Sequence, residues 1–198
     1  SLKMAFAGIP AAIPAFRIAE PLKGANSSSQ YIGVVTYRSA LLEQDDFIKI
    51  EVGLREPLVT EARKMPAHTV LINPMTGTEE FTPISIPCIS LPEAFAEKFR
   101  AALTRREVAI RDYFDIDYAV LHKKIAIEDA KFLRLVKTKL AVPGTGPVLI
   151  SAERQAHLVS QVDRELKAVL REEDLRAFDI ERAMRTVMDL AARIGASD

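Results

Sequence analysis

Two runs with β-strand character give the clearest pattern in the first half of the chain. The first, residues 31–37, is rich in β-branched and aromatic side chains, and the second covers residues 47–54. The second run alternates, with its apolar side chains on one face: Ile48, Ile50, Val52 and Leu54. Its polar face carries Lys49, Glu51, Gly53 and Arg55. Asp45-Asp46 predicts a turn between the runs, which we therefore expect to pair as antiparallel strands covered on one face by other elements.

The segments around this pair carry weaker signals. Residues 1–30 contain three prolines and a loop-like run at 24–29, which together predict an irregular or short helical segment. Residues 69–72 predict a strand and residues 73–77 a turn. A third strand is expected at residues 82–88, where two prolines favour the edge of a sheet.

From Ser90 onward the apolar spacing becomes helical. Ser90 and Glu93 fit a capping box, in which the hydroxyl accepts the amide of Glu93 and the Glu93 carboxylate reaches back. A first helix starts there, and further helices are expected at residues 107–123, 127–140, 152–171 and 174–194, with a break at 143–147. The pattern predicts an α+β fold. A partial mixed sheet lies in a first domain of residues 1–88, and an all-helical domain follows at 89–198.

The composition describes an ordinary globular protein without a strong charge. The chain has 198 residues, of which 48% are hydrophobic, and 27 basic residues balance 27 acidic ones. No overall positive field can attract nucleic acid, so such a contact would need a local patch. The single cysteine, Cys88, excludes an internal disulfide, fits a cytoplasmic location and is expected to be a buried structural thiol. No apolar run is long enough to span a membrane.

Charged side chains on two successive helices form the candidate constellation. Lys98 and Arg105 lie seven residues apart and share one helix face, and Asp112 and Asp115 lie three apart and share a face of the next helix. The two pairs can form a network between the helices. That network is either a structural ion-pair lattice or a site for phosphates, which Lys meets as a point charge and Arg as a planar fork. Glu51, on the polar face of its strand, points either into a cleft or into solvent.

These stretches resemble, in order and spacing, the nucleotidyltransferases of the AbiEii/AbiGii toxin type. The stretches that carry the resemblance are Lys49-Ile50-Glu51, Arg55-Glu56-Pro57, Glu93 to Lys98 and Arg111 to Asp115. The resemblance covers residues 30–120, and it implies a small nucleotidyltransferase sheet with a helical C-terminal domain. It also implies that a nucleotide is transferred from a nucleoside triphosphate to an RNA or protein acceptor.

The same resemblance implies roles for individual residues. Glu51 matches the third active-site acid of the sheet and would be a ligand of Mg²⁺. Lys98 would contact the nucleotide phosphates, and Asp112 would belong to the motif of the helical domain. The residues expected to support them are Lys49, Arg105, Arg111 and Asp115.

One part of the family pattern is not found in these residues. The family begins with a Gly-Gly or Gly-Ser loop and an Asp-x-Asp pair, which hold metal ions and phosphates. Here no Asp precedes Asp45, and Asp45-Asp46 is expected in a turn. We therefore expect that the chain alone does not catalyse nucleotide transfer. The alternative is a non-catalytic interaction module that binds an antitoxin or forms a homo-oligomer through exposed strand edges.

Other candidate sites are weaker. His68, His122 and His157 lack the spacing of zinc ligands, and the Pro-Gly-Thr-Gly-Pro loop at 143–147 lacks the Gly-Lys-Ser/Thr of a phosphate loop. A basic run contains Lys131, Arg134, Lys137 and Lys139. It is either a solvated helix face or a contact surface for RNA or nucleotide phosphates.

Overall fold

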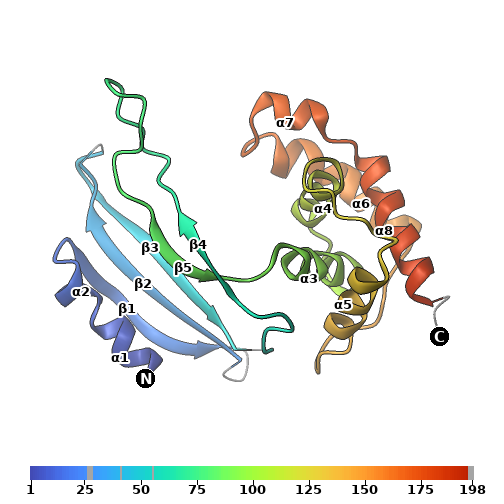
Figure 1. Cartoon of the computed structure of the whole chain (residues 1–198), viewed down its shortest axis with the longest axis horizontal. Helices are drawn as coiled ribbons and strands as arrows, with labels where there is room; N and C mark the ends of the chain where they lie inside the picture. The colour runs from blue at the N-terminus through green and yellow to red at the C-terminus, as the bar shows by residue number, and fades with distance from the viewer. Residues whose placement is uncertain (26–28, 41, 55, 196–198) are drawn as a thin grey trace. The chain divides into compact units, whose positions relative to one another are not determined.

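The computed structural model describes residues 1–25, 29–40, 42–54 and 56–195 (Figure 1). Contacts divide the chain into two compact units, Ser1–Pro57 and Leu58–Asp198, each with its own hydrophobic core. The sequence predicts a domain boundary after Cys88. A short β-hairpin lies between these two positions, and by its contacts it belongs to the second unit. The predicted α+β class is confirmed.

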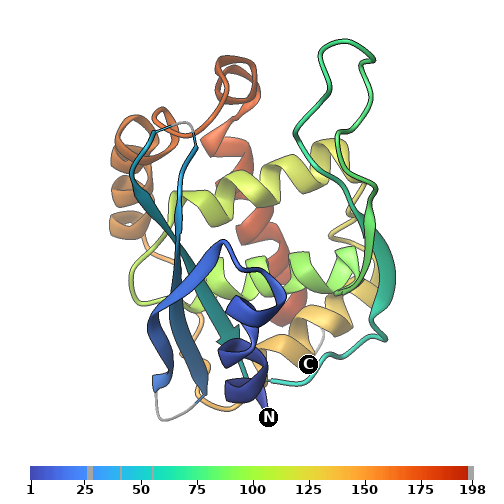
Figure 2. The same cartoon turned by 90° about the vertical axis from the view of Figure 1, so that its left-hand side faces the viewer.

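The first unit is a three-stranded antiparallel sheet backed by two short helices. The helices are α1 (Leu2–Ala7) and α2 (Ile9–Ala12). The strands are β1 (Phe16–Ala25), β2 (Gln30–Arg38) and β3 (Asp45–Gly53), paired in the order β1-β2-β3. Phe6 of α1 packs on Leu22 of β1 and Val35 of β2, and these three buried side chains form the core of the unit. Both α1 and α2 contact β1 (Figure 2).

The antiparallel pairing of the two predicted strands is confirmed, with Val35 opposite Ile48 and Tyr31 opposite Val52. The predicted turn at Asp45-Asp46 is wrong. Both residues lie in β3, and just before that strand the Ser39 amide donates to the Gln44 carbonyl at 2.9 Å.

The alternation along β3 holds best at its centre. Ile50 packs against the core of the first unit and Val52 is half-buried, but Ile48 and Leu54 are exposed. The loop expected at 24–29 falls partly in β1 and partly at 26–28, which lie outside the described residues, as does Arg55.

β1 is a strand where the sequence predicted irregular or short helical structure. Its pairing with β2 shifts register twice, between Ile18 and Glu20 and between Glu20 and Lys23, and Pro21 lies in the second of these intervals. Proline is accepted on edge strands and at bulges because no ladder donor is lost there. The short helical part of the same prediction is confirmed by α1 and α2.

A close contact between helix and sheet requires glycine at position 33. A Cβ atom placed on Gly33 would lie 2.5 Å from the ring of Phe6. Gly33→Ala is therefore expected to lower the free energy of unfolding of the first unit by about 1–3 kcal/mol, because the buried ring must shift. Gly53→Ala is the control, since nothing lies within 4 Å of its Cβ position. Urea denaturation of both variants tests this, and equal effects would contradict it.

The second unit begins with a two-stranded hairpin. β4 (Arg63–Ala67) pairs antiparallel with β5 (Ile84–Cys88), which confirms the predicted third strand. All strand pairs among the described residues are antiparallel rather than mixed, because hairpins connect them. The predicted strand at 69–72 is wrong, since Ile72 makes only an isolated bridge with Glu79. The turn at 73–77 is confirmed: the Asn73 side chain accepts the Met75 amide at 2.9 Å.

Helices make up the rest of the second unit. They are α3 (Leu91–Thr104), α4 (Ile110–His122), α5 (Ala130–Leu140), α6 (Ala152–Gln161), the π-helical turn η1 (Val162–Leu166), α7 (Glu172–Ala177) and α8 (Ile180–Gly195). α8 packs against α3, α4 and α5 (Figure 2). Their shared core includes Phe99, Ile116, Val136 and Leu190. No described helix has the length and apolar character needed to cross a bilayer.

Two of the predicted helices are interrupted. The one expected at 152–171 ends its α-helical part at Gln161 and continues as η1. The one expected at 174–194 is divided between α7 and α8, because Phe178 is extended and the Asp179 carboxylate accepts the Arg182 amide at 3.0 Å, as an N-cap does.

Candidate functional site

A charged cleft in the helical unit brings together five of the predicted site residues. It has a volume of about 400 Å³. The charged residues lining it are Lys98 and Arg105 from the α3 side and Arg111, Asp112 and Asp115 from α4. Its apolar wall consists of Phe114, Leu166, Val169 and Leu170. The cleft therefore combines a polar side with an apolar surface.

The predicted network between the two helices is present. The Lys98 ammonium lies 2.6 Å from an Asp115 oxygen and 3.4 Å from Asp112 Oδ1. Arg105 Nη1 lies 3.1 Å from the other Asp112 oxygen, Oδ2. That oxygen is buried and receives no directed hydrogen bond from the described residues, so its contact with Arg105 is one of charge. Asp112 is the shared centre of the network, with its side chain only 3% exposed.

The cations of the cleft differ in how strongly they are held. Burial alone would lower the pKa of Lys98, but the hydrogen bond and charge of Asp115, with those of Asp112, raise it above its usual value. Lys98 therefore remains an ammonium at neutral pH. Arg111 is exposed in the first turn of α4, and no ion pair joins it to an acidic residue in the part of the chain that the structure describes. Its guanidinium is available to a ligand.

A buried glutamine fixes the start of α4. Gln161, at the end of α6, accepts the Ile110 amide at 2.8 Å and donates to the Val108 carbonyl at 3.0 Å. The first bond pairs an amide that the first turn of a helix leaves without a partner, and the second holds the residue before the N-cap. Because Arg111 and Asp112 lie in that turn, Gln161 holds the polar side of the cleft in place.

Lys49 and Glu51 belong to the first unit. They lie two residues apart on the exposed face of β3, where the Lys49 ammonium pairs with the Glu51 carboxylate. The second oxygen of that carboxylate accepts a hydrogen bond from the Gln30 side chain at 3.1 Å. The seven predicted residues are thus divided between the units: two in the sheet and five in the cleft.

Comparison with known proteins decides the family. Residues 1–191 match the family described as nucleotidyl transferase AbiEii toxin, type IV toxin–antitoxin system. The chain belongs to the AbiEii family. The resemblance seen in residues 30–120 is thereby confirmed over nearly the whole length.

Solved structures similar to this AbiEii chain come from Helicobacter pylori. One is described as a candidate nucleotidyltransferase, with 15% identity and a TM-score of 0.46, covering 96% of this chain and 72% of that one. The other is the protein JHP933, with 16% identity and a TM-score of 0.46, covering 96% and 70%. No curated protein matches the sequence. A likeness at this level says nothing about the chemistry of either unit.

The described residues of this AbiEii chain do not gather the ligands of a Mg²⁺ site by themselves. Mg²⁺ is usually held by one or two carboxylates together with phosphate oxygens and waters. Within residues 1–25, 29–40, 42–54 and 56–195, no three His, Cys, Asp or Glu side chains gather in a way that could hold a metal ion. Glu51 is paired with Lys49, and Asp112 and Asp115 are paired with Lys98. The implied role of Glu51 as a metal ligand therefore finds no support in its surroundings.

Several residues that line or support the cleft had no signal of that role in the sequence. Gln161 is one of many polar residues on a helix, and only the fold reveals that it is buried against the start of α4. Leu166, Val169 and Leu170 belong to or follow the π-helical turn, which helical periodicity does not predict. Such π-helical turns are frequent at functional sites, and η1 contributes Leu166 to the apolar wall of the cleft.

Proposed function

We propose that this AbiEii-family chain binds the phosphates of a nucleoside triphosphate in the cleft between α3 and α4, as the nucleotide-binding part of a nucleotidyltransferase. The observation that carries the proposal is the gathering of Lys98, Arg105 and Arg111 around one cleft of about 400 Å³. Three cations face two carboxylates, so the cleft attracts anions even when the internal ion pairs are intact.

Each cation suits a different part of this task. Arg111, which has no acidic partner among the described residues, can present its planar fork to two phosphate oxygens. Lys98 supplies a point charge whose position is set by Asp112 and Asp115. The apolar wall of Phe114, Leu166 and Leu170 offers a surface for the base.

Glu51 and Lys49 enter the proposal only through the family resemblance. In the family, transfer of the nucleotide requires an active-site acid on the sheet that helps to hold metal. The Glu51 carboxylate would first have to leave Lys49 to serve in this way. The proposal made here is therefore one of nucleotide binding.

Arg111→Ala is expected to weaken nucleotide binding by roughly tenfold while leaving stability unchanged, because the side chain is exposed and without an acidic partner in the described structure. ATP, GTP, CTP and UTP, each with Mg²⁺, would be titrated while thermal unfolding is followed. Wild type is expected to show a concentration-dependent rise in Tm with at least one nucleotide. The variant should need about ten times more of it.

Arg185→Ala is the matched control, since Arg185 is also an exposed helical arginine but lies on α8, outside the cleft. Lys98→Ala should also weaken binding, but it removes two ion pairs, so its Tm must be compared with its own nucleotide-free value. Binding that is the same in wild type and Arg111→Ala would contradict the proposal.

Protein binding is the second candidate function. The loop that joins β4 to β5 exposes large apolar side chains, with Val70 99% and Met75 90% accessible. Exposed apolar groups of this kind favour contact with another protein, and the family of type IV toxin–antitoxin systems points to an antitoxin as partner. Absence of any nucleotide effect in the titrations would favour this role and would make the α3–α4 network a structural lattice.

A further inference from the structure

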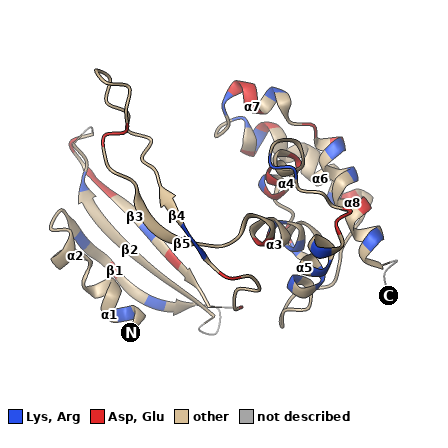
Figure 3. Cartoon of the chain, in the orientation of Figure 1, with Lys and Arg blue, Asp and Glu red and all other residues tan. Residues whose placement is uncertain are grey.

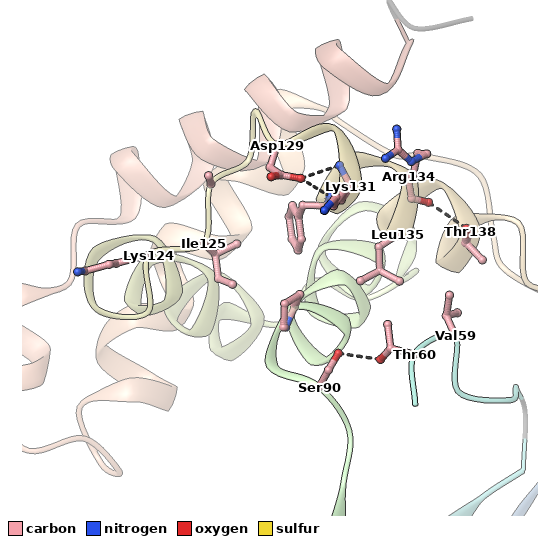
Figure 4. A pocket seen from close by; sticks show the side chains of 13 residues that line it. Val59, Thr60, Ser90, Lys124, Ile125, Asp129, Lys131, Arg134, Leu135 and Thr138 are labelled. Carbon is pink, nitrogen blue, oxygen red and sulfur yellow. Dashed lines mark hydrogen bonds between the residues drawn. The ribbon is translucent and has the colours of Figure 1, made fainter. Parts of the chain in front are cut away.

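A second pocket of the helical unit shares no residue with the charged cleft. It has a volume of about 510 Å³, larger than the cleft. Its walls come from α5, from the loop at residues 124–126 before that helix, from the start of α3, and from Val59 and Thr60 (Figure 4). A volume of this size is typical of sites for small molecules. Neither the family nor the proposed nucleotide site accounts for it.

The interior of this pocket is apolar. Its apolar lining consists of Val59, Pro92, Ile125, Ala126, Phe132 and Leu135. In Figure 4 the side chains of Ile125 and Leu135 extend towards the hollow. The Thr60 hydroxyl is already bonded to Glu93 and lies 2.8 Å from the Ser90 hydroxyl, and the Thr138 hydroxyl donates to the Arg134 carbonyl. The interior therefore favours the binding of an apolar group over that of a polar one.

The rim of the same pocket is basic. Lys124, Lys131 and Arg134 line it, and none of them forms a side-chain ion pair with an acidic residue of the described chain. Figure 3 shows several basic positions along α5. The single acid of the rim, Asp129, is occupied as the N-cap of α5, accepting the amides of Lys131 at 2.6 Å and Phe132 at 3.0 Å. The rim thus has three cations against one carboxylate and a net positive charge.

Hydrogen bonds to Glu93 of α3 hold in place the pocket wall formed by Val59 and Thr60. Their amides each donate to the Glu93 carboxylate at 2.7 Å, and Glu93 is in turn paired with Lys139 at 2.7 Å. Glu93 and Lys139 are both fully buried. A pocket whose walls are fixed in this way is already formed before a ligand binds. Little conformational entropy is therefore lost when the ligand binds.

We propose that this pocket binds a small organic anion, with its apolar body against Ile125, Phe132 and Leu135 and its acidic group at Lys131 and Arg134. Charge complementarity selects an anion, because three cations of the rim face one carboxylate. The apolar interior selects a ligand with a hydrophobic body over a bare ion such as inorganic phosphate. Carboxylate and phosphate head groups share this chemistry. This inference is independent of nucleotide binding in the cleft.

The test uses the full chain and the fluorescent anion anilinonaphthalene sulfonate as probe. We expect saturable binding that decanoate or decyl phosphate displaces, whereas uncharged decanol displaces it at least roughly tenfold less well. The relative strength of decanoate and decyl phosphate identifies the preferred head group. Binding should also weaken as salt is raised, because the rim charges are exposed.

Two variants locate the site. Lys131→Glu/Arg134→Glu reverses two exposed charges of the rim, and Ala126→Trp fills the pocket without changing charge. Each should weaken displaceable binding by roughly tenfold. Arg63→Glu/Lys64→Glu is the matched control: it makes the same change in net charge on the exposed positions of β4, away from the pocket, and should bind as wild type does.

Three results would overturn the inference. The first is displaceable binding that survives unchanged in both pocket variants. The second is displacement by decanol as strong as by decanoate and decyl phosphate, which would mean a purely apolar site. The third is displacement by an acidic amphipathic peptide alone, which would make the pocket a groove for a protein partner.

Discussion

Glu93→Gln is expected to lower the free energy of unfolding of the helical unit by roughly 3–5 kcal/mol, the largest effect predicted for a single substitution in this chain. The Glu93 carboxylate and the Lys139 ammonium are both fully buried and lie 2.7 Å apart. Removing the negative charge takes away the fully buried one of the two carboxylates that contact the Lys139 ammonium; the other, Glu97 at 2.8 Å, is partly exposed. A buried cation that loses its counter-charge is costly because water cannot replace it.

The same carboxylate also organises the backbone. It accepts the amides of Val59 and Thr60 and the hydroxyl of Thr60, and in this way ties the first residues of the second unit to α3. A neutral glutamine can accept at one oxygen only, so at least one of these donors loses its bond. The loss of backbone hydrogen bonds adds to the electrostatic cost.

The pH dependence of stability follows from the pKa of Glu93. Burial alone would raise this pKa, but the hydrogen bonds from Lys139, Thr60 and the Val59 and Thr60 amides lower it from 4.5 to about 2. Because the folded pKa is the lower one, the stabilisation is complete above pH 4.5 and is lost as the pH falls towards about 2. This part of the pH dependence should be missing in Glu93→Gln.

Urea denaturation followed by circular dichroism, at pH 7 and across the acid range, measures both effects. Glu97→Gln is the control: its side chain is 34% exposed, so the loss should be about 1 kcal/mol. Glu93→Gln/Lys139→Met should recover part of the stability by removing the buried ammonium that has lost its buried carboxylate. A loss in Glu93→Gln no larger than in Glu97→Gln would show that the pair is not needed for stability.

The case of Glu93 shows where sequence reasoning is sufficient and where it is not. The Ser90–Glu93 pattern correctly predicted the start of α3, and the Ser90 hydroxyl does accept the Glu93 amide at 3.3 Å. The predicted return of the carboxylate to the Ser90 backbone is wrong, because that carboxylate is bonded to Thr60 and Lys139. These partners are distant in sequence, and no local spacing points to them.

The same limit applies to Lys139. The basic run of Lys131, Arg134, Lys137 and Lys139 predicts a solvated face or a contact surface, yet Lys139 is fully buried. Cys88, expected to be buried, is only half-buried in β5. Whether a side chain is buried depends on which elements pack over it, and local sequence patterns do not show which distant elements those are.

The network of the cleft could be predicted because its spacing is local. Lys98 and Arg105 share one face at the α3 side, and Asp112 and Asp115 share one face of α4. Two consecutive helices joined by a short connection usually pack side by side, which brings these two faces together. The strand pair β2–β3 was predictable on the same principle, since two-residue alternation marks a half-buried strand. Whether Lys49 and Glu51 act with the cleft depends on contacts between units, which no local pattern reveals.

Arg182→Ala is expected to cost roughly 3 kcal/mol of stability, because it breaks the link between α8 and α4. Arg182 Nε and Nη2 donate to the two oxygens of Asp117 at 2.7 and 2.8 Å, a bidentate pair in which the Asp117 side chain is only 3% exposed. Without the guanidinium, the carboxylate keeps a single hydrogen bond from the described residues, that of the Asp179 amide at 3.3 Å. Arg182→Lys should restore little, since an ammonium cannot make the fork.

The measurement for Arg182 combines stability with ligand binding. Arg185→Ala, one turn away and joined to Glu181 by a contact of 3.9 Å between exposed groups, should cost under about 0.5 kcal/mol in the same urea titration. Because α4 carries Arg111, Asp112 and Asp115, loosening its link to α8 should also weaken nucleotide binding in the folded variant by a few-fold. A variant that loses stability but binds nucleotide as wild type does would show that α3 and Gln161 suffice to place α4 at the cleft. Equal stability of Arg182→Ala and Arg185→Ala would show instead that the bidentate pair contributes nothing.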